Sequence, residues 1–193
     1  MTPTAPEILT PRLRLRLPTP DDAARYLAYV TDNRAHFAPW DPERDASYFT
    51  LEHWCTTLQG AVDAWRAGTQ LSLVLESHDG TPDRLLGHAT FSQIVRGPFQ
   101  AATLGYALDH REVGRGLMFE ALEAAIGYAF CELRLHRVMA NYMPANVRSG
   151  ALLRRLGFVP EGYARDYLRL AGEWQDHVLT ARTNADWTPD PPG

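Results

Sequence analysis

The stretch that most constrains this chain is the hexapeptide Arg-Glu-Val-Gly-Arg-Gly at residues 111–116. A buried-strand pattern, Ala102–Leu108, comes before it, and a run with apolar residues at helical spacing, Leu117–Phe130, follows it. Glycine permits positive φ and lets a ligand approach the backbone closely. The free N–H groups of the first helical turn then point at a bound anion, with the helix dipole behind them. The sequence therefore predicts an anion-binding turn between a strand and a helix.

The spacing of this turn is R-x-x-G-x-G. It differs from the dinucleotide fingerprint G-x-G-x-x-G and from the P-loop G-x-x-x-x-G-K-[ST]. Arg111 and Arg115 flank the glycines and can add charge-assisted hydrogen bonds to phosphate oxygens. An ordinary connection between a strand and a helix can carry similar residues, so the six residues alone leave both interpretations open.

Composition indicates one globular domain covering residues 1–193, ordered over about 8–187, with a flexible tail at 188–193. The net charge of −4 and the lack of a lysine-rich tract argue against nucleic-acid binding through a basic surface. No apolar h-region opens the chain, and no run of 18 apolar residues occurs. We therefore expect a cytoplasmic protein that binds neither DNA nor a membrane.

The two cysteines, Cys55 and Cys131, lack the spacing of metal ligands or of a redox motif. Both fall in predicted helices, so we interpret them as buried free thiols. No cluster of His, Cys and Asp has metal-ligand spacing, and we expect no metal. The seven histidines are scattered along the chain and receive no role.

Hydrophobic periodicity predicts the order strand, two helices, three strands, helix, strand, helix and two strands. In the first strand, leucines 13, 15 and 17 alternate with arginines 12, 14 and 16, which we interpret as a solvated face. The chain before Ile8 is expected to be irregular. Strands are predicted at 13–17, 70–76, 85–95, 102–108, 137–143, 158–170 and 174–183, and helices at about 21–31, 47–67, 117–130 and 147–156.

A second motif lies about 30 residues beyond the first. The segment 146–158 reads N-x-x-S-x-x-L-x-x-x-L-G-F, and one predicted strand separates it from the glycine turn. The two motifs in this order resemble the signatures of the GNAT acetyltransferase superfamily, in which the first is the pyrophosphate loop for acetyl-coenzyme A. The resemblance implies an α+β fold with a mixed, mostly antiparallel twisted sheet of about seven strands and about four helices.

Longer segments narrow the resemblance. They are similar to the bacterial ribosomal-protein-alanine N-acetyltransferases over about Thr10 to Trp187: TPRLRLR, NRAHFAPWDPERD, IVRGPF, GRGLMFEALEAAIGY, HRVMANYMPANVRSGALLRRLGFVPEGYARDYL and GEWQDHVLTA. The resemblance implies transfer of an acetyl group from acetyl-coenzyme A to the N-terminal amine, here of alanine, of a ribosomal protein, by direct attack in a ternary complex. Ribosome assembly particles are a further expected partner. Two alternatives stay open: an acetyltransferase of a small amine or antibiotic, and a coenzyme-A-binding ribosome-assembly factor.

The acid–base chemistry favours an N-terminal acceptor. An α-amino group has a pKa near 7.7–8.0, so roughly one in ten is neutral at pH 7, whereas a lysine amine near 10.4 is neutral less than about one time in a thousand. Removing the extra proton costs an N-terminal substrate only about 1 kcal/mol. A modest general base therefore suffices.

The resemblance also assigns cofactor-binding positions. The pantetheine arm of the cofactor is expected to separate two parallel strands and to pair with the strand that ends near Leu108. Asn146 is expected to bind this arm or to cap the following helix. Arg148 could reach the adenosine 3′-phosphate or stay exposed. The pyrophosphate is assigned to Arg111, Gly114, Arg115, Gly116, Leu117 and Met118.

Two carboxylates are candidates for the general base. Asp166 matches the position where relatives carry a carboxylate near the amine, and Glu161 is the second candidate. A structural alternative exists for each, either a solvated carboxylate or an ion pair.

The leaving thiolate needs a hydrogen-bond donor. Many family members place a tyrosine directly after the leucine equivalent to Leu152, but Leu153 stands here. By resemblance, Ser149 is the nearest replacement, and its alternative role is that of a helix N-terminal serine bonded to the backbone. Tyr142 and Tyr163 are weaker candidates.

An aromatic and proline-rich loop, residues 36–42, could wall a substrate pocket or pack against its own helices. We expect its segment 37–40 to form a narrow pocket for a small first residue, opposite the strand segment 163–168.

Overall fold

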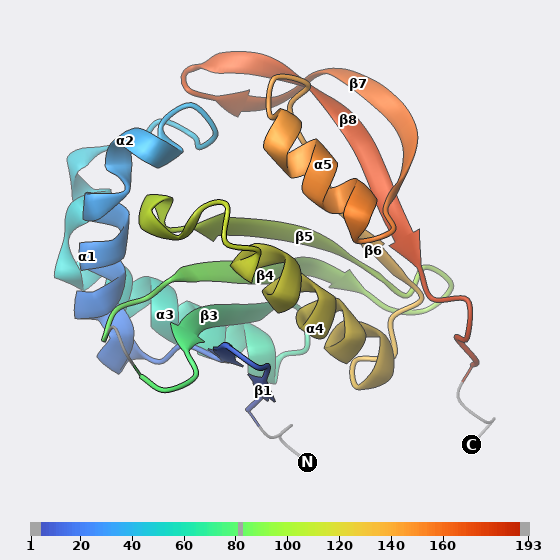
Figure 1. The fold of residues 1–193 in the computed structure, drawn as a ribbon, viewed down its shortest axis with the longest axis horizontal. Coiled ribbons are helices and arrows are strands. Elements are labelled where there is room, and N and C mark those ends of the chain that lie inside the picture. The colour runs from blue at the N-terminus through green and yellow to red at the C-terminus, as the bar shows by residue number, and fades with distance from the viewer. Residues whose placement is uncertain (1–4, 81–82, 190–193) are drawn as a thin grey trace.

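The computed structural model describes residues 5–80 and 83–189. In this part of the chain, a single mixed sheet has the strand order β1-β2-β3-β4-β5-β6-β8-β7, and only the β5–β6 pair is parallel (Figure 1). The predicted α+β class with a mostly antiparallel sheet is confirmed. The sheet has eight strands rather than about seven.

The elements follow the predicted order closely. The strands are β1 Glu7–Leu9, β2 Leu13–Arg16, β3 Leu71–Ser77, β4 Gly87–Val95, β5 Ala101–Leu108, β6 Arg137–Met139, β7 Val159–Leu170 and β8 Glu173–Thr183. The α-helices are α1 Ala23–Asp32, α2 Arg34–Phe37, α3 Leu51–Arg66, α4 Leu117–Cys131 and α5 Val147–Arg155. Short 3₁₀ turns are η1 Pro20–Asp22, η2 Ala46–Phe49 and η3 His110–Glu112.

The additional strand is β1, in a segment that we expected to be irregular. Glu7 to Leu9 pair antiparallel with Arg16 to Arg14 of β2, at the edge of the sheet. A three-residue strand is too short to show a period of two, and its pairing depends on the open edge of β2 rather than on its own residues. The predicted tail, residues 188–193, falls mostly outside the described residues.

The predicted helix 47–67 is in fact two elements. Thr50 has extended backbone, with φ −123° and ψ 150°, and separates η2 from α3. Its hydroxyl oxygen accepts a hydrogen bond from the backbone N–H of His53 at 3.3 Å, which caps α3. Threonine is a favoured N-cap, so the side chain itself sets this boundary.

Helices cover both faces of the sheet. Along β3, Leu73 and Leu75 belong to the larger apolar cluster, whereas Val74 between them belongs to the smaller one. Because successive side chains of a strand point to opposite faces, the two clusters lie on opposite sides of the sheet. The larger cluster contains the buried side of α4, and the smaller one lies under α1 and α3. Figure 1 shows α4 in front of the sheet and α3 behind it.

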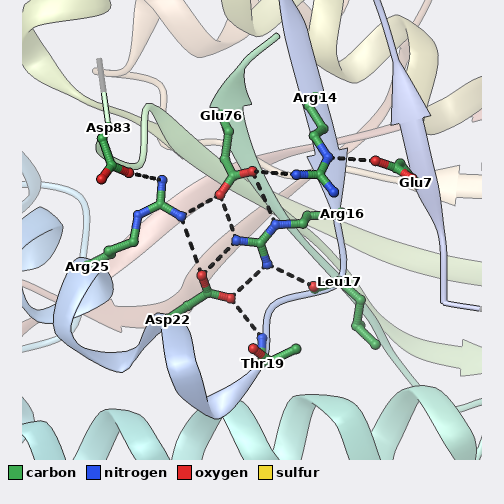
Figure 2. Close-up of polar contacts among 9 residues, drawn as sticks. All are labelled: Glu7, Arg14, Arg16, Leu17, Thr19, Asp22, Arg25, Glu76 and Asp83. Atoms are coloured by element: carbon green, nitrogen blue, oxygen red, sulfur yellow. Dashed lines mark hydrogen bonds and ion pairs between the residues drawn. The ribbon is translucent and has the colours of Figure 1, made fainter. Parts of the chain in front are cut away.

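The arginine face at β2 is solvated only in part, whereas we predicted a solvated face. The side chains of Arg12 and Arg14 are 49% and 42% exposed, but Arg16 is covered. The guanidinium of Arg16 makes a two-point contact with Asp22, with nitrogen–oxygen distances of 2.7 and 2.6 Å, and a third contact with Glu76 at 2.6 Å. Arg25 of α1 also donates to Glu76, at 2.5 Å (Figure 2). The side chain of Arg16 is only 18% exposed. Carboxylates from η1 and from β3, far away in sequence, cover Arg16, and the alternation within β2 could not indicate this.

The two cysteines are exposed, so the prediction of buried thiols is wrong. The buried stripe of α3 runs through Trp54, Leu58, Ala61 and Trp65, and Cys55 lies beside it. Cys131 is the last residue of α4. A helical segment offers three to four buried positions in every two turns, and both cysteines fall outside them.

Candidate active site

The two parallel strands of the sheet separate after three residues. Ala101 to Thr103 pair with Arg137 to Met139, and β5 then continues to Leu108 with β4 alone. The chain after β6 instead stays with β8, through a bond from the N–H of Ala140 to the carbonyl of Thr180 at 3.0 Å. Within the described residues, segment 104–108 therefore has no strand partner on its β6 side. An extended ligand that carries amides can add to such an edge.

The glycine turn has the predicted backbone conformation. Gly114 and Gly116 have φ of 85° and 76°, and Gly116 is the N-cap of α4. The first helical hydrogen bond runs from the N–H of Glu120 to the carbonyl of Gly116, at 3.2 Å. The N–H groups of residues 117–119 therefore have no acceptor within the helix. A Cβ built on Gly114 would meet no heavy atom within 4 Å, so the space above the turn is open.

The guanidinium groups that flank the turn are already paired with carboxylates. Arg111 contacts Asp109 at 2.9 and 2.6 Å and Asp32 at 3.1 Å. Arg115 donates to Glu112 at 2.5 Å. The backbone N–H groups at the start of α4 are thus the donors that the turn leaves free for an anion. The predicted arginine contacts would need these ion pairs to rearrange.

Asp109 holds the connection between β5 and the turn. Its side chain is fully buried and also contacts Arg84 at 2.8 Å. Burial opposes its ionisation, but hydrogen bonds from the side chain and the N–H of Arg111 outweigh burial and lower its pKa to about 2. The buried Asn33 of the α1–α2 junction accepts from the N–H of His110 at 2.8 Å and lies 2.9 Å from its Nδ1. The histidines received no role from the sequence, but His110 thus joins this connection to α1.

The second motif places Asn146 and Ser149 at the start of α5. The side-chain oxygen of Asn146 accepts from the N–H of Ser149 at 3.1 Å, which confirms the capping interpretation of Asn146. The hydroxyl of Ser149 lies 2.8 Å from the hydroxyl of Tyr106, which comes from the unpaired part of β5. The Ser149 hydroxyl is therefore bonded to a side chain across the opening between the strands, not to the backbone.

Sequence reasoning missed Tyr106. It reads as one member of an apolar strand, and nothing near it marks a polar partner 43 residues away. Along β5, Tyr106 alternates with Leu104 and Ala102, which both lie in the larger apolar cluster beneath α4. This alternation could have placed the Tyr106 ring on the face of the sheet that α4 covers. Burial raises the pKa of Tyr106 to about 12, although the hydrogen bond with Ser149 acts in the opposite direction. The phenol therefore keeps its proton at neutral pH.

The two candidate bases lie at different ends of this region. Glu161 forms an ion pair with Arg137. Arg137 opposes Ala101, where β5 and β6 are still paired. This is the ion-pair alternative that we considered for Glu161, and it holds the carboxylate away from the opening.

Asp166 lies in an irregular part of β7, with φ of 48°. Its N–H donates to Asp176 at 2.9 Å, and no hydrogen bond or ion pair engages its own carboxylate among the described residues. The hydroxyl of the next residue, Tyr167, accepts from the side-chain amide of Asn141 at 3.1 Å. Asn141 lies two residues after β6, at the open end. The structure thus leaves Asp166 exposed and close in sequence to a residue at the opening.

A cavity of about 690 Å³ lies beside the aromatic loop. Ala171 of the β7–β8 turn lines it, whereas residues 163–168 do not, so the predicted opposite wall is wrong. Because β7 pairs with β8 along its length, the turn between these strands, and not the middle of β7, lies against the aromatic loop. Burial raises the pKa of Asp41 in this cavity, and the nearby Arg44 partly opposes that rise. The other lining residues are Val30, Arg34, Phe37, Ala38, Pro42, Glu43, Asp45, Tyr48 and Phe49.

Over 5–80 and 83–189, the histidine, cysteine and acidic side chains form no group of three or more that could hold a metal ion. None of the helices in these ranges has the length and apolar character needed to cross a membrane.

Comparison with known proteins agrees with this geometry. The family described as the acetyltransferase (GNAT) domain matches residues 12–159. The chain is 46% identical to the [ribosomal protein uS5]-alanine N-acetyltransferase of Escherichia coli, covering 94% of this chain and 93% of that protein. It is 36% identical to a probable N-acetyltransferase of Bacillus subtilis, covering 86% and 90% of the two chains.

Solved structures have the same fold. The ribosomal-protein-S5-alanine acetyltransferase of Vibrio fischeri superposes with a TM-score of 0.90 at 36% identity, over 95% of this chain and all of that one. RimJ of Mycobacterium smegmatis, solved in complex with CoA-disulfide, has a TM-score of 0.85 at 28% identity, over 94% and 88% of the chains. The family match covers more than half of the residues and includes the glycine turn and the first turn of α5. The chain belongs to the GNAT family of acetyltransferases.

Proposed function

We propose that this protein transfers the acetyl group of acetyl-coenzyme A to the N-terminal alanine of a ribosomal protein. One observation supports an N-terminal alanine as the acceptor. It is the 46% identity to the E. coli uS5-alanine N-acetyltransferase over 94% of the chain. A match of this extent covers the aromatic loop and the β7–β8 hairpin as well as the cofactor motifs. The reaction takes place in the cytoplasm, where ribosomal proteins are made and assembled.

The cofactor is bound along β5 and at the start of α4. The backbone edge of residues 104–108 accepts the pantetheine arm, and Leu108 marks the end of that edge. The turn from Gly114 to Gly116 and the N–H groups of Leu117 and Met118 hold the pyrophosphate. Arg111 and Arg115 contribute positive charge nearby while they remain paired with carboxylates.

The acceptor amine attacks the thioester carbonyl directly. A nitrogen–carbon bond forms, the carbon–sulfur bond breaks, and sulfur leaves with the electron pair. Asp166 takes the amine proton, directly or through water, and its lack of a partner among the described residues supports this role. The Ser149 hydroxyl donates a hydrogen bond to the departing sulfur. Glu161 is the second choice for the base, because Arg137 already holds its carboxylate.

The alternatives are a small-amine acetyltransferase and a coenzyme-A-binding assembly factor. The cavity beside the aromatic loop carries Arg34 and Arg44 among its acids. Arg34 lies over the ring of Phe49 at 4.6 Å, and Arg44 over that of Tyr48 at 4.5 Å. Two fixed guanidinium groups disfavour a polycationic drug or polyamine.

N-terminal mass analysis of ribosomal proteins tests the acceptor. A strain that lacks this protein should lose the acetyl mass from one ribosomal protein that begins with alanine. Expression of the intact chain should restore the modification, and expression of Gly114→Glu should not. Unchanged N-terminal masses of all ribosomal proteins in the deletion strain would contradict the proposal and favour a small amine. Restoration of the mark by Gly114→Glu would contradict the assigned cofactor loop.

A further inference from the structure

The pair formed by Tyr106 and Ser149 joins two elements that the opening of the sheet keeps apart. Tyr106 belongs to β5, beyond the last residue that pairs with β6. Ser149 belongs to the first turn of α5, three residues after its N-cap. Their hydroxyl oxygens are 2.8 Å apart, and this is the only side-chain hydrogen bond of either hydroxyl among the described residues.

The direction of this hydrogen bond decides what Ser149 can do. Each hydroxyl has one proton to donate and lone pairs to accept with. If Ser149 donates to Tyr106, its proton is used and cannot reach a ligand in the opening. If Tyr106 donates, the Ser149 oxygen accepts and its own proton is free. A phenol is the stronger acid of the two and thus the better donor.

The surroundings favour Tyr106 as the donor. Its phenol is largely buried, and without Ser149 its proton would have no partner among the described residues, which is a costly arrangement in an apolar setting. Ser149 is fixed in turn, because its N–H is bound by Asn146. A chain in which Tyr106 donates to Ser149 also polarises the serine hydroxyl and strengthens the bond that it donates.

We propose that Tyr106 is a positioning residue that orients the Ser149 hydroxyl toward the sulfur of the leaving group. This inference rests on the proposed acetyl transfer and adds a residue to it. During transfer, the sulfur leaves with the electron pair of the broken carbon–sulfur bond, and the base takes the amine proton. Tyr106 and Ser149 keep their protons and stabilise the developing thiolate by hydrogen bonding.

A double-mutant cycle separates positioning from packing. Tyr106→Phe keeps the ring and removes the hydroxyl. It should lower kcat about tenfold with little change in either KM, because one neutral hydrogen bond is lost. Ser149→Ala should lower kcat about 100-fold. In the Ser149→Ala background, Tyr106→Phe should cause no further loss, since its partner is gone. Tyr128→Phe, on α4 and packed against the same apolar cluster, is the matched control and should keep the wild-type rate.

A second measurement does not depend on turnover. The thiol of bound coenzyme A can be titrated through the ultraviolet absorbance of its thiolate. The wild type should lower the thiol pKa relative to free coenzyme A, and Tyr106→Phe and Ser149→Ala should each reverse part of that shift. An unchanged thiol pKa in Tyr106→Phe, or equal losses of kcat from Tyr106→Phe with and without Ser149, would overturn the inference. If the wild type acetylated no ribosomal peptide, the acceptor proposal would fail, while this titration would still report on Tyr106.

Discussion

The backbone N–H of Ala171 donates a 2.9 Å hydrogen bond to the backbone carbonyl oxygen of Asp41. This bond joins the turn between β7 and β8 to the loop after α2, and both segments line the cavity of about 690 Å³. Gly172, with φ of 82°, lies directly beside this bond. A Cβ built on Gly172 would come within 2.8 Å of a Glu43 carboxylate oxygen. The loop and the hairpin therefore support each other at one edge of this cavity.

Gly172→Ala should weaken acceptor binding. The new methyl group pushes the Glu43 side chain away, and the positive φ adds strain. We expect KM for the acceptor peptide to rise about tenfold, with KM for acetyl-coenzyme A unchanged. Gly68→Ala is the control, because it has a similar φ of 70° and no heavy atom within 4 Å of its Cβ. An equal rise of KM in the control would assign the effect to strain in general rather than to this contact.

Gly114→Glu should abolish cofactor binding and leave the protein folded. The new carboxylate would occupy the space above the turn and repel a phosphate. Calorimetry with acetyl-coenzyme A measures the loss directly. Gly97→Glu is the matched control, since it also has positive φ and open space around the Cβ but lies between β4 and β5. Wild-type affinity in a folded Gly114→Glu protein would refute the assignment of the pyrophosphate loop.

Asp166→Asn should lower kcat by about 10²–10⁴-fold at pH 7, the usual contribution of one general base. The loss should shrink above the amine pKa, about 7.7–8.0, because the free amine then needs no base. Ser149→Ala should show no such rescue, since it acts on the departing sulfur. The measurement is the pH dependence of kcat for both variants. If Asp166→Asn keeps the wild-type rate at pH 7, Asp166 is not the general base, and Glu161 or a chain of waters takes the amine proton.

Local signals account for the parts of the structure that could be predicted. The positive φ of Gly114 and Gly116 and the cap at Asn146 follow from residue types within a few positions. The missed features depend on partners far away in sequence. Tyr106 contacts Ser149 across 43 residues, and Arg16 contacts Glu76 across 60. Periodicity assigns a side chain to a face of a strand, but it carries no information on which distant side chain will cover that face.

Glu76→Gln should destabilise the fold by about 3 kcal/mol at pH 7, because it removes the largely buried negative charge that Arg16 and Arg25 share and leaves Asp22 as their main carboxylate partner. Figure 2 shows the Glu76 carboxylate between Arg16 and Arg25. The control is Glu123→Gln, at the more exposed ion pair with Arg182, where the free energy of unfolding should change by less than about 1 kcal/mol. Urea denaturation measures both. Equal losses of unfolding free energy in the two variants would show that the ion pairs of Glu76 contribute no more to stability than a surface pair does.

The lowered pKa of the Glu76 carboxylate also predicts how the stability of the fold depends on pH. Burial opposes ionisation of Glu76, but hydrogen bonds from Arg16 and Arg25 outweigh it and lower its pKa below the ordinary 4.5. A lowered pKa in the folded state means that this stabilisation is fully present above pH 4.5 and is lost as the pH falls below it. The difference in unfolding free energy between the wild type and Glu76→Gln should therefore shrink in acid. A difference that grows below pH 4.5 would contradict the ion-pair account.

The most direct test of the central claim is a pair of peptides that copy the start of a ribosomal protein. One begins with a free alanine, and the other is blocked at that amine and carries an internal lysine. Acetyl incorporation from acetyl-coenzyme A is followed by mass spectrometry at pH 7. We predict rapid modification of the free alanine and almost none of the lysine, whose amine is neutral less than about one time in a thousand. Acetylation of the blocked peptide at an equal or higher rate would contradict an N-terminal acceptor and favour a lysine or a small amine.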